Sequence, residues 1–284
     1  MGKTAAAQAE GKNMNGSIQA ETVSADGIQT DYVRFGHGEQ VFVILPGLSV
    51  DSVMKYADAV AEAYSLLTDD FTVYLFDRRK GLPGTYSVYD MARDTADAIR
   101  ALGMEQVCLF GASQGGMIAM TMAAEYPGLV RKLILGSTAA CVDPEQFKTI
   151  GEWIRLAEAG NAEELYMAFG EAIYPREIFE QSRDMLAAAA KTVTEEDLKR
   201  FIILAEGMKG FDMTERLEQI LCPVLVMGSA DDAVLGGEAS ERIAAAFSGR
   251  RDCELYMYDG YGHAVYDLAP DYKERILRFC LQED

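Results

Sequence analysis

Short apolar runs recur along the chain, and amphipathic segments separate several of them. The runs are VFVIL at 41–45, FTVYLF at 71–76, VCLF at 107–110, KLIL at 132–135, VLVM at 224–227 and ELYMY at 254–258. Their apolar residues are continuous rather than alternating, which is typical of strands buried on both faces. Segments 87–103 and 237–247 carry apolar residues at helical spacing, and Gly103 is placed to end the first. This order predicts an α/β fold with a mostly parallel, doubly wound sheet.

The alternation stops after about residue 140. Segments such as EQFKTIGEWIRLAEA and TEEDLKRFIILAEGM have amphipathic helical patterns, but no strand-like apolar run occurs before about residue 216. We expect residues 141–216 to form a helical cap, or lid, over the carboxyl edge of the sheet, where open α/β sheets bind ligands. Residues 26–140 and 217–284 would then form the two parts of the core. Residues 1–25 are expected to be a flexible N-terminal tail.

The charge balance argues against two classes of partner. The 26 Lys and Arg residues against 45 Asp and Glu residues give a net charge of −19. Binding to nucleic-acid phosphates or to an anionic membrane needs clustered Lys and Arg, so we expect neither partner. The N-terminal stretch lacks the apolar core of a signal peptide, and no apolar run approaches bilayer-spanning length.

The cysteines indicate a reducing compartment. There are five, an odd number, and they are scattered without a CxxC pair. This pattern favours neither a disulfide framework nor a zinc site. We therefore expect a cytoplasmic protein, and the sequence leaves open whether it forms a homo-oligomer.

A serine stands between glycines in the stretch VCLFGASQGGMIAM at 107–120. A serine hydroxyl becomes a useful nucleophile when a base removes its proton and a sharp turn projects it into a site. VCLF precedes Ser113 as a strand and QGGMIAMTMAAEYP follows it as a helix. Gly111 and Gly115 would allow the close backbone approach of such a turn, and Gly116 would let the helix pack tightly. Without this context the motif is weak, but with it we interpret Ser113 as a nucleophile.

The chain offers two histidines as the base. His263 follows the last apolar run and is expected on a loop at the carboxyl edge of the sheet. His37 lies between two early strands, and we interpret it as a hairpin residue far from Ser113. We therefore expect His263 to be the base.

An acid must orient the imidazole and stabilise its positive charge. Where a nucleophilic serine sits on a strand-to-helix turn, the acid comes between the serine and the histidine in the chain. PVLVMGSADDAVL supplies Asp231 and Asp232 after a strand. Only one of the two can easily point at His263. We favour Asp231, three residues past Gly228, and assign turn or cap formation to Asp232.

Acyl transfer also needs donors for the developing oxyanion. We expect one from the backbone N–H of Gln114, at the start of the helix that follows Ser113. The second would come from Leu48, in the loop after VFVIL, because Gly47 lets that loop turn close to the substrate. Pro46 and Gly47 are also what an ordinary loop uses, so this donor rests on position alone.

Four motifs together resemble the α/β-hydrolase superfamily. They are Gly111-Ala-Ser-Gln-Gly115, Gly228-Ser-Ala-Asp231, Gly262-His263 and Leu45-Pro-Gly47. The segments FDRRKG at 76–81 and YPGLVRKLILGST at 126–138 add to the resemblance, which covers nearly all of the chain after about residue 28. It implies the α/β-hydrolase fold with a helical cap inserted after the sixth strand. Two departures are Pro46, where His is common, and Met120, where Gln is common.

The leading functional hypothesis is a serine hydrolase that cleaves a small carboxylic ester, thioester or lactone. Ser113, His263 and Asp231 would form the triad, and no metal or organic cofactor is implied. A carbon–carbon bond hydrolase or an acyltransferase would use the same triad. An iminopeptidase-like peptidase would need carboxylates near the cap, for which Glu158, Glu163 and Glu164 are candidates. A non-catalytic small-molecule receptor is the alternative from another class.

Overall fold

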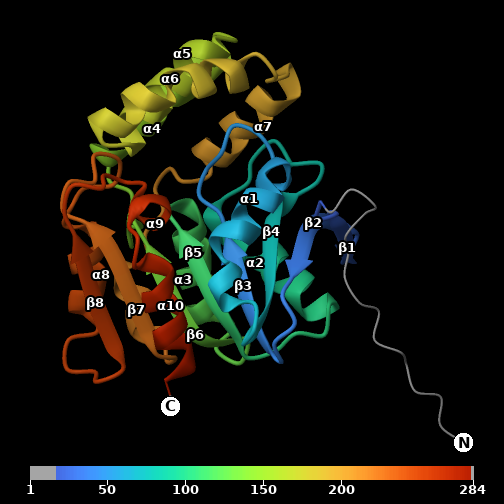
Figure 1. Cartoon of the computed structure of the whole chain (residues 1–284), viewed down its shortest axis with the longest axis vertical. Helices are drawn as coiled ribbons and strands as arrows, with labels where there is room; N and C mark the ends of the chain where they lie inside the picture. Colours follow the sequence, from blue (N-terminus) through green and yellow to red (C-terminus); the bar gives the residue numbers. More distant parts are fainter. Residues whose placement is uncertain (1–16, 283–284) are drawn as a thin grey trace, which may run out of the picture.

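The computed structural model describes residues 17–282, and eight strands in this range form one sheet (Figure 1). The strands are β1 Glu21–Ala25, β2 Ile28–Phe35, β3 Gln40–Leu45, β4 Phe71–Arg79, β5 Val107–Ala112, β6 Val130–Gly136, β7 Val224–Ser229 and β8 Cys253–Tyr258. Their order across the sheet is β1-β2-β4-β3-β5-β6-β7-β8. The pairs β1–β2 and β2–β4 are antiparallel, and the remaining pairs, from β4 across to β8, are parallel. The six apolar runs are therefore confirmed as strands of a mostly parallel sheet.

The predicted N-terminal tail is too long. Residues 21–25 of that tail form β1, which pairs with β2 from Glu21 opposite Tyr32 to Ala25 opposite Ile28. Only Val23 of this edge strand is buried, so the apolar signal of ETVSA is weak. Residues 1–16 lie outside the described part of the chain.

Helices cover both faces of the sheet. The α-helices are α1 Ala57–Ala63, α2 Val88–Ala101, α3 Gln114–Glu125, α4 Gln146–Glu158, α5 Ala162–Ile173, α6 Arg176–Ala190, α7 Glu195–Glu206, α8 Ala239–Ala246, α9 Val265–Leu268 and α10 Tyr272–Leu281; the 3₁₀ helices are η1 Val53–Tyr56, η2 Ser65–Leu67 and η3 Thr214–Gln219. Val43 and Leu45 of β3 belong to the same apolar cluster as residues of α2, α3 and α8, whereas Phe42 and Ile44 belong to a second cluster with residues of α1 and α10. This alternation confirms the doubly wound arrangement. Within residues 17–282, no helix combines the length and the apolar composition needed to cross a lipid bilayer.

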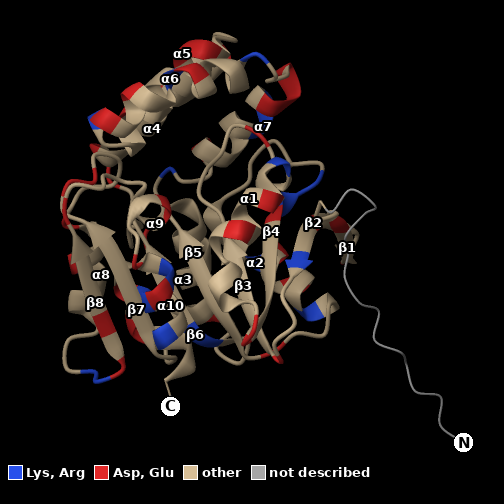
Figure 2. Cartoon of the chain, in the orientation of Figure 1, with Lys and Arg blue, Asp and Glu red and all other residues tan. Residues whose placement is uncertain are grey.

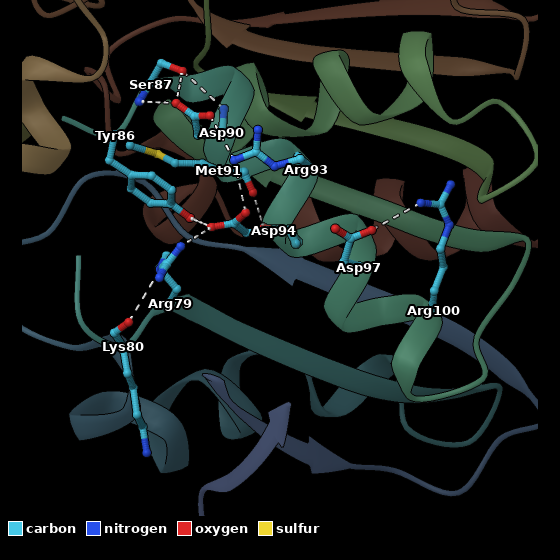
Figure 3. Close-up of polar contacts among 11 residues, drawn as sticks. Arg79, Lys80, Tyr86, Ser87, Asp90, Met91, Arg93, Asp94, Asp97 and Arg100 are labelled. Carbon is cyan, nitrogen blue, oxygen red and sulfur yellow. Dashed lines mark hydrogen bonds and ion pairs between the residues drawn. The ribbon is translucent and has the colours of Figure 1, made fainter. Parts of the chain in front are cut away.

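Helix α2 is fixed at its first turn and at its middle (Figure 3). Ser87 and Asp90 form a capping box, in which each side chain accepts a hydrogen bond from the other residue's backbone N–H. Further along, the buried Asp94 accepts hydrogen bonds from Tyr86 (3.0 Å) and from Arg79 of β4 (3.3 Å). These contacts tie α2 to the carboxyl end of β4.

Helices α4–α7 lie between β6 and β7 in the chain and stand beyond one edge of the sheet (Figure 1). An isolated bridge pairs Cys141 with Asp212, and the Met213 N–H donates to the Ala140 carbonyl at 2.7 Å. The chain therefore leaves and re-enters the sheet layer at neighbouring points. The helical character predicted for this stretch agrees with α4–α7.

Candidate active site

Ser113 occupies the sharp turn between β5 and α3. Its backbone has φ +52° and ψ −119°, in a region that residues other than glycine rarely adopt. The turn is secured because the Ser113 N–H donates to the Gly136 carbonyl (2.8 Å) and the Thr138 hydroxyl donates to the Ser113 carbonyl (2.7 Å). The strand–turn–helix expected around Ser113 is therefore present.

The glycines around Ser113 are required by close packing. A Cβ at Gly111 would lie 2.2 Å from the Gly115 carbonyl oxygen, and one at Gly115 would lie 2.1 Å from the Leu45 carbonyl oxygen. A Cβ at Gly116 would lie 2.6 Å from Cβ of Thr138, which belongs to the loop after β6. Any side chain at these positions would push the turn away from the neighbouring strands.

Ser113 and His263 line the same small cavity, whose volume is about 30 Å³. Gly47, Leu48 and Tyr266 also line it, and most of the remaining wall is apolar. The apolar lining residues are Ile150, Trp153, Phe169, Ile173, Met208 and Val234. Trp153 and Phe169 come from α4 and α5, so these two helices contribute to the cavity beside Ser113. The cavity wall is thus mainly apolar, with the polar groups of Ser113 and His263 on it.

His263 contacts Asp232. Nδ1 of the imidazole lies 2.8 Å from Oδ2 of Asp232, and both side chains are almost completely buried. Oδ1 of Asp232 accepts hydrogen bonds from the backbone N–H groups of Val234 (2.8 Å) and Leu235 (3.1 Å). Asp232 engages Nδ1 of the ring, so Nε2 is the other ring nitrogen that could exchange a proton.

The expectation that Asp231 faces His263 is wrong. The Asp231 carboxylate accepts hydrogen bonds from the Ser229 hydroxyl and from the backbone N–H groups of Gly260 and Gly262, both at 3.1 Å. Asp231 thus holds the loop that carries His263, while its neighbour faces the ring. Adjacent side chains in a tight turn point in different directions, and the spacing from Gly228 does not tell which one turns inward.

The pKa values of the two carboxyl groups do not distinguish them. Burial works to raise the pKa of Asp232, but the His263 ring and the backbone N–H groups outweigh it, so the pKa lies below its usual value. Burial likewise opposes ionisation of Asp231, and hydrogen bonds from Ser229 and Gly262 still leave its pKa lowered. Both are carboxylates at neutral pH, so the assignment rests on contact geometry.

The two expected oxyanion donors lie beside Ser113. A Cβ at Gly47 would be 3.2 Å from Cβ of Ser113, so the loop after β3 passes directly over the serine. Leu48 follows in this loop and lines the cavity, and Gln114 is the first residue of α3. Among the hydrogen bonds of residues 17–282, neither backbone N–H donates to a protein acceptor. Both N–H groups are thus available to a ligand, and their role in stabilising an oxyanion remains a prediction.

His37 lies away from this cavity. Its exposed ring is 3.6 Å from the Asp69 carboxylate, and its backbone N–H donates to the Thr68 carbonyl at 3.0 Å. The residue connects β2 and β3, which are separated in the sheet by β4, so the expected hairpin does not form.

The carboxylates proposed for an iminopeptidase do not gather at the cavity. Glu158, Glu163 and Glu164 are exposed, and none of them lines the space beside Ser113. Glu163 and Glu164 stand in the first turn of α5, where acidic side chains favour the helix dipole. Figure 2 shows Asp and Glu scattered over the layers around the sheet as well as over α4–α7. Within residues 17–282, no three His, Cys, Asp or Glu side chains gather as a metal site requires.

Some cavity residues carry no recognisable signal in the sequence. Tyr266 follows His263 by three positions and packs edge-on against its ring, with centroids 6.3 Å apart. Met208 and Val234 enter the cavity from just beyond α7 and from the turn after β7. These residues lie near α7, Asp232 or His263 in the sequence, but proximity in sequence does not determine where a side chain points.

Comparisons with known proteins agree with this geometry. A sequence model of the family described as "Serine aminopeptidase, S33" matches residues 36–267. A protein of Rhizobium rhizogenes named "Putative carbamate hydrolase RutD" is 27% identical over 222 residues, covering 75% of this chain and 84% of that protein. The crystal structure of MGS-M2, an α/β-hydrolase enzyme from a Medee basin deep-sea metagenome library, superposes with a TM-score of 0.82 and 21% identity, covering 93% of this chain and 98% of the other. The enol-lactonase of Burkholderia xenovorans LB400 superposes with a TM-score of 0.79 and 17% identity, covering 92% and 100%. The chain belongs to the serine aminopeptidase S33 family and is an enzyme of the α/β-hydrolase fold.

Proposed function

We propose that the protein is a serine hydrolase that cleaves a small carboxylic ester, thioester or lactone through Ser113, His263 and Asp232. The 2.8 Å contact between His263 and Asp232, at the cavity that Ser113 also lines, is the observation that carries this proposal. The backbone strain at Ser113 adds support, because such strain is typical of a nucleophile held at a sharp turn.

The reaction would proceed in two acyl transfers. The Ser113 hydroxyl attacks the substrate carbonyl while Nε2 of His263 takes its proton, and Asp232 stabilises the imidazolium. The carbonyl oxygen becomes an oxyanion that accepts hydrogen bonds from the N–H groups of Leu48 and Gln114. His263 then returns the proton to the leaving alcohol or thiol, which leaves an acyl group on Ser113. Water attacks this acyl-enzyme in the same way and regenerates the serine.

The cavity favours a short acyl group. Its volume of about 30 Å³ accommodates roughly two water molecules. Its apolar wall includes Trp153 and Phe169, whose ring centroids are 4.5 Å apart. An acetyl group places one methyl against this wall, whereas a longer chain requires the wall to move.

A carbamate is the second candidate substrate. The relatives named RutD, which share 27–28% identity with most of this chain, favour it. A carbamate also carries a carbonyl that Ser113 can attack, with an oxyanion in the same position. We rank the ester first because the lining is mainly apolar.

Steady-state turnover of p-nitrophenyl acetate, butyrate, hexanoate and a p-nitrophenyl carbamate tests the proposal. We expect measurable turnover, a decline in kcat/KM as the acyl chain lengthens, and loss of turnover in Ser113→Ala. A folded protein that turns over none of these substrates, or a Ser113→Ala variant that keeps its activity, would contradict it.

A further inference from the structure

The guanidinium of Arg78 touches the loop after β3 and the first residue of α3. Arg78 lies at the carboxyl end of β4, and its side chain is buried. Nη2 donates to the Pro46 carbonyl at 2.7 Å and to Oε1 of Gln114 at 3.1 Å. One nitrogen therefore joins two segments that are far apart in the sequence.

Both segments carry a proposed oxyanion donor. The Pro46 carbonyl belongs to the peptide that precedes Gly47, and the next peptide carries the N–H of Leu48. A hydrogen bond that fixes the Pro46–Gly47 peptide plane limits rotation of the adjoining Gly47–Leu48 plane, which glycine otherwise leaves free. Gln114 supplies the second N–H from its own backbone, and its side chain is held by the same guanidinium.

The orientation of the Gln114 amide is determined from its other end. Nε2 of Gln114 donates to the Leu204 carbonyl of α7 at 2.7 Å, and the side chain has no exposed surface. Because Nε2 must donate there, Oε1 is the atom that faces Arg78 and accepts from it. The contact from Arg78 to Gln114 is thus complementary in donor and acceptor.

Burying the charged guanidinium of Arg78 is energetically unfavourable. The hydrogen-bond partners of its guanidinium are neutral oxygens, and its Nε atom has no partner among residues 17–282. Burial lowers the pKa of Arg78 to about 10, although nearby Asp77 works to raise it, so the side chain is still a cation at neutral pH. A buried cation with an unpaired N–H contributes little to stability. Its contribution is to fix geometry at one edge of the cavity.

We propose that Arg78 is a positioning residue that holds the Leu48 and Gln114 N–H groups in place for the oxyanion. This inference rests on the proposed function, because it assigns a role in stabilising the tetrahedral intermediate. Arg78 is not among the residues that line the cavity beside Ser113, and it would act through the Pro46 carbonyl and the Gln114 side chain.

The test compares Arg78→Met with Arg79→Met. Both replacements remove one guanidinium from the same end of β4, but Arg79 pairs with Asp94 in the cluster around α2 (Figure 3). For Arg78→Met we expect kcat with p-nitrophenyl acetate to fall about 100-fold, as for loss of an oxyanion donor, while KM changes less than about threefold. Arg79→Met should keep kcat within about threefold of the wild type.

A second readout separates positioning from a general loss of structure. A trifluoromethyl ketone binds serine hydrolases as a tetrahedral oxyanion, so its Ki in Arg78→Met should rise in parallel with the loss in kcat/KM. If Arg78→Met does not fold, Gln114→Leu is measured instead. It removes the Arg78 contact but keeps the backbone N–H, and we expect about a tenfold fall in kcat with unchanged KM.

Wild-type kcat or an unchanged ketone Ki in folded Arg78→Met would overturn the inference and leave the serine-hydrolase proposal intact. Wild-type protein that neither turns over the ester nor binds the ketone would overturn both. A rise in KM with kcat unchanged would also overturn the inference, because it would mean that Arg78 shapes the binding of the substrate instead.

Discussion

Ser113 has a strained backbone conformation that hydrogen bonds with neighbouring residues help to hold. A positive φ at a residue other than glycine costs about 1–3 kcal/mol. The hydrogen bonds to Gly136 and from Thr138 help to hold that conformation. The orientation of the Asp232 carboxylate is also fixed, because the Val234 and Leu235 N–H groups donate to one oxygen while His263 contacts the other. The Ser113 backbone and the Asp232 carboxylate thus have little freedom to change orientation.

Replacing each aspartate separately tests which one acts with His263. Asp232→Asn should lower kcat by about 10³- to 10⁴-fold, because an amide at that position favours the wrong imidazole tautomer. Asp231→Asn should lower kcat less than about tenfold, since its carboxylate contacts Ser229 and two loop N–H groups rather than the His263 ring. The measurement is steady-state ester hydrolysis by each purified variant. A larger loss in Asp231→Asn would return the assignment to that residue.

These residues also show what the sequence can predict. The position of Ser113 follows from strand, turn and helix patterns that come together at one serine. His263 follows because the chain has only one other histidine, which lies in an early loop. The choice between Asp231 and Asp232 depends on the turn after β7, and its side-chain directions are set by contacts with Gly260, Gly262 and His263 that the local sequence does not encode.

At the scale of elements, helices α4–α7 are attached to the sheet layer by polar contacts beside the cavity. Arg200 of α7 pairs with Asp77 of β4 and donates to the Asp51 carbonyl at 3.4 Å. Leu204, one turn later, accepts from Gln114. The helical periodicity of this region and its expected position over the carboxyl edge follow from the sequence, but the contacts that hold it do not, because they join distant segments.

Trp153 of α4 is predicted to set the acyl-chain preference. Trp153→Leu should raise kcat/KM for hexanoate relative to acetate by about tenfold. The smaller Leu side chain leaves room for one or two more methylene groups of the hexanoyl chain. Phe147→Leu is the matched control: Phe147 lies on the same helix but lines a different surface hollow. Separate steady-state assays of the two p-nitrophenyl esters give the ratio of kcat/KM. An unchanged preference in Trp153→Leu would show that another residue limits chain length.

At the scale of the molecule, the sheet buries several tyrosines among its apolar side chains. Tyr64 and Tyr272 pack on one face and Tyr86 on the other. Burial raises the pKa of all three, and for Tyr86 the nearby Asp94 adds to the effect. The protonated form is therefore favoured in the folded protein.

Alkaline pH should destabilise the fold through these tyrosines. A free tyrosine ionises near pH ~10, so the stabilising effect is fully present below that pH and is lost as the pH rises toward the folded pKa values. We expect the free energy of unfolding in urea to be lower at pH 11 than at pH 8. Absorbance at 295 nm should show fewer tyrosinates at pH 11 in folded than in urea-unfolded protein. Coincident titration curves would contradict the prediction.

The central claim is that Ser113 is an activated nucleophile in a triad with His263 and Asp232. The most direct test is the intact mass of the wild type and of Ser113→Ala after incubation with a fluorophosphonate. We predict a single adduct on the wild type, located in the peptide that contains Ser113, and no adduct on Ser113→Ala. A folded wild type without an adduct, or an adduct that persists in Ser113→Ala, would contradict the claim.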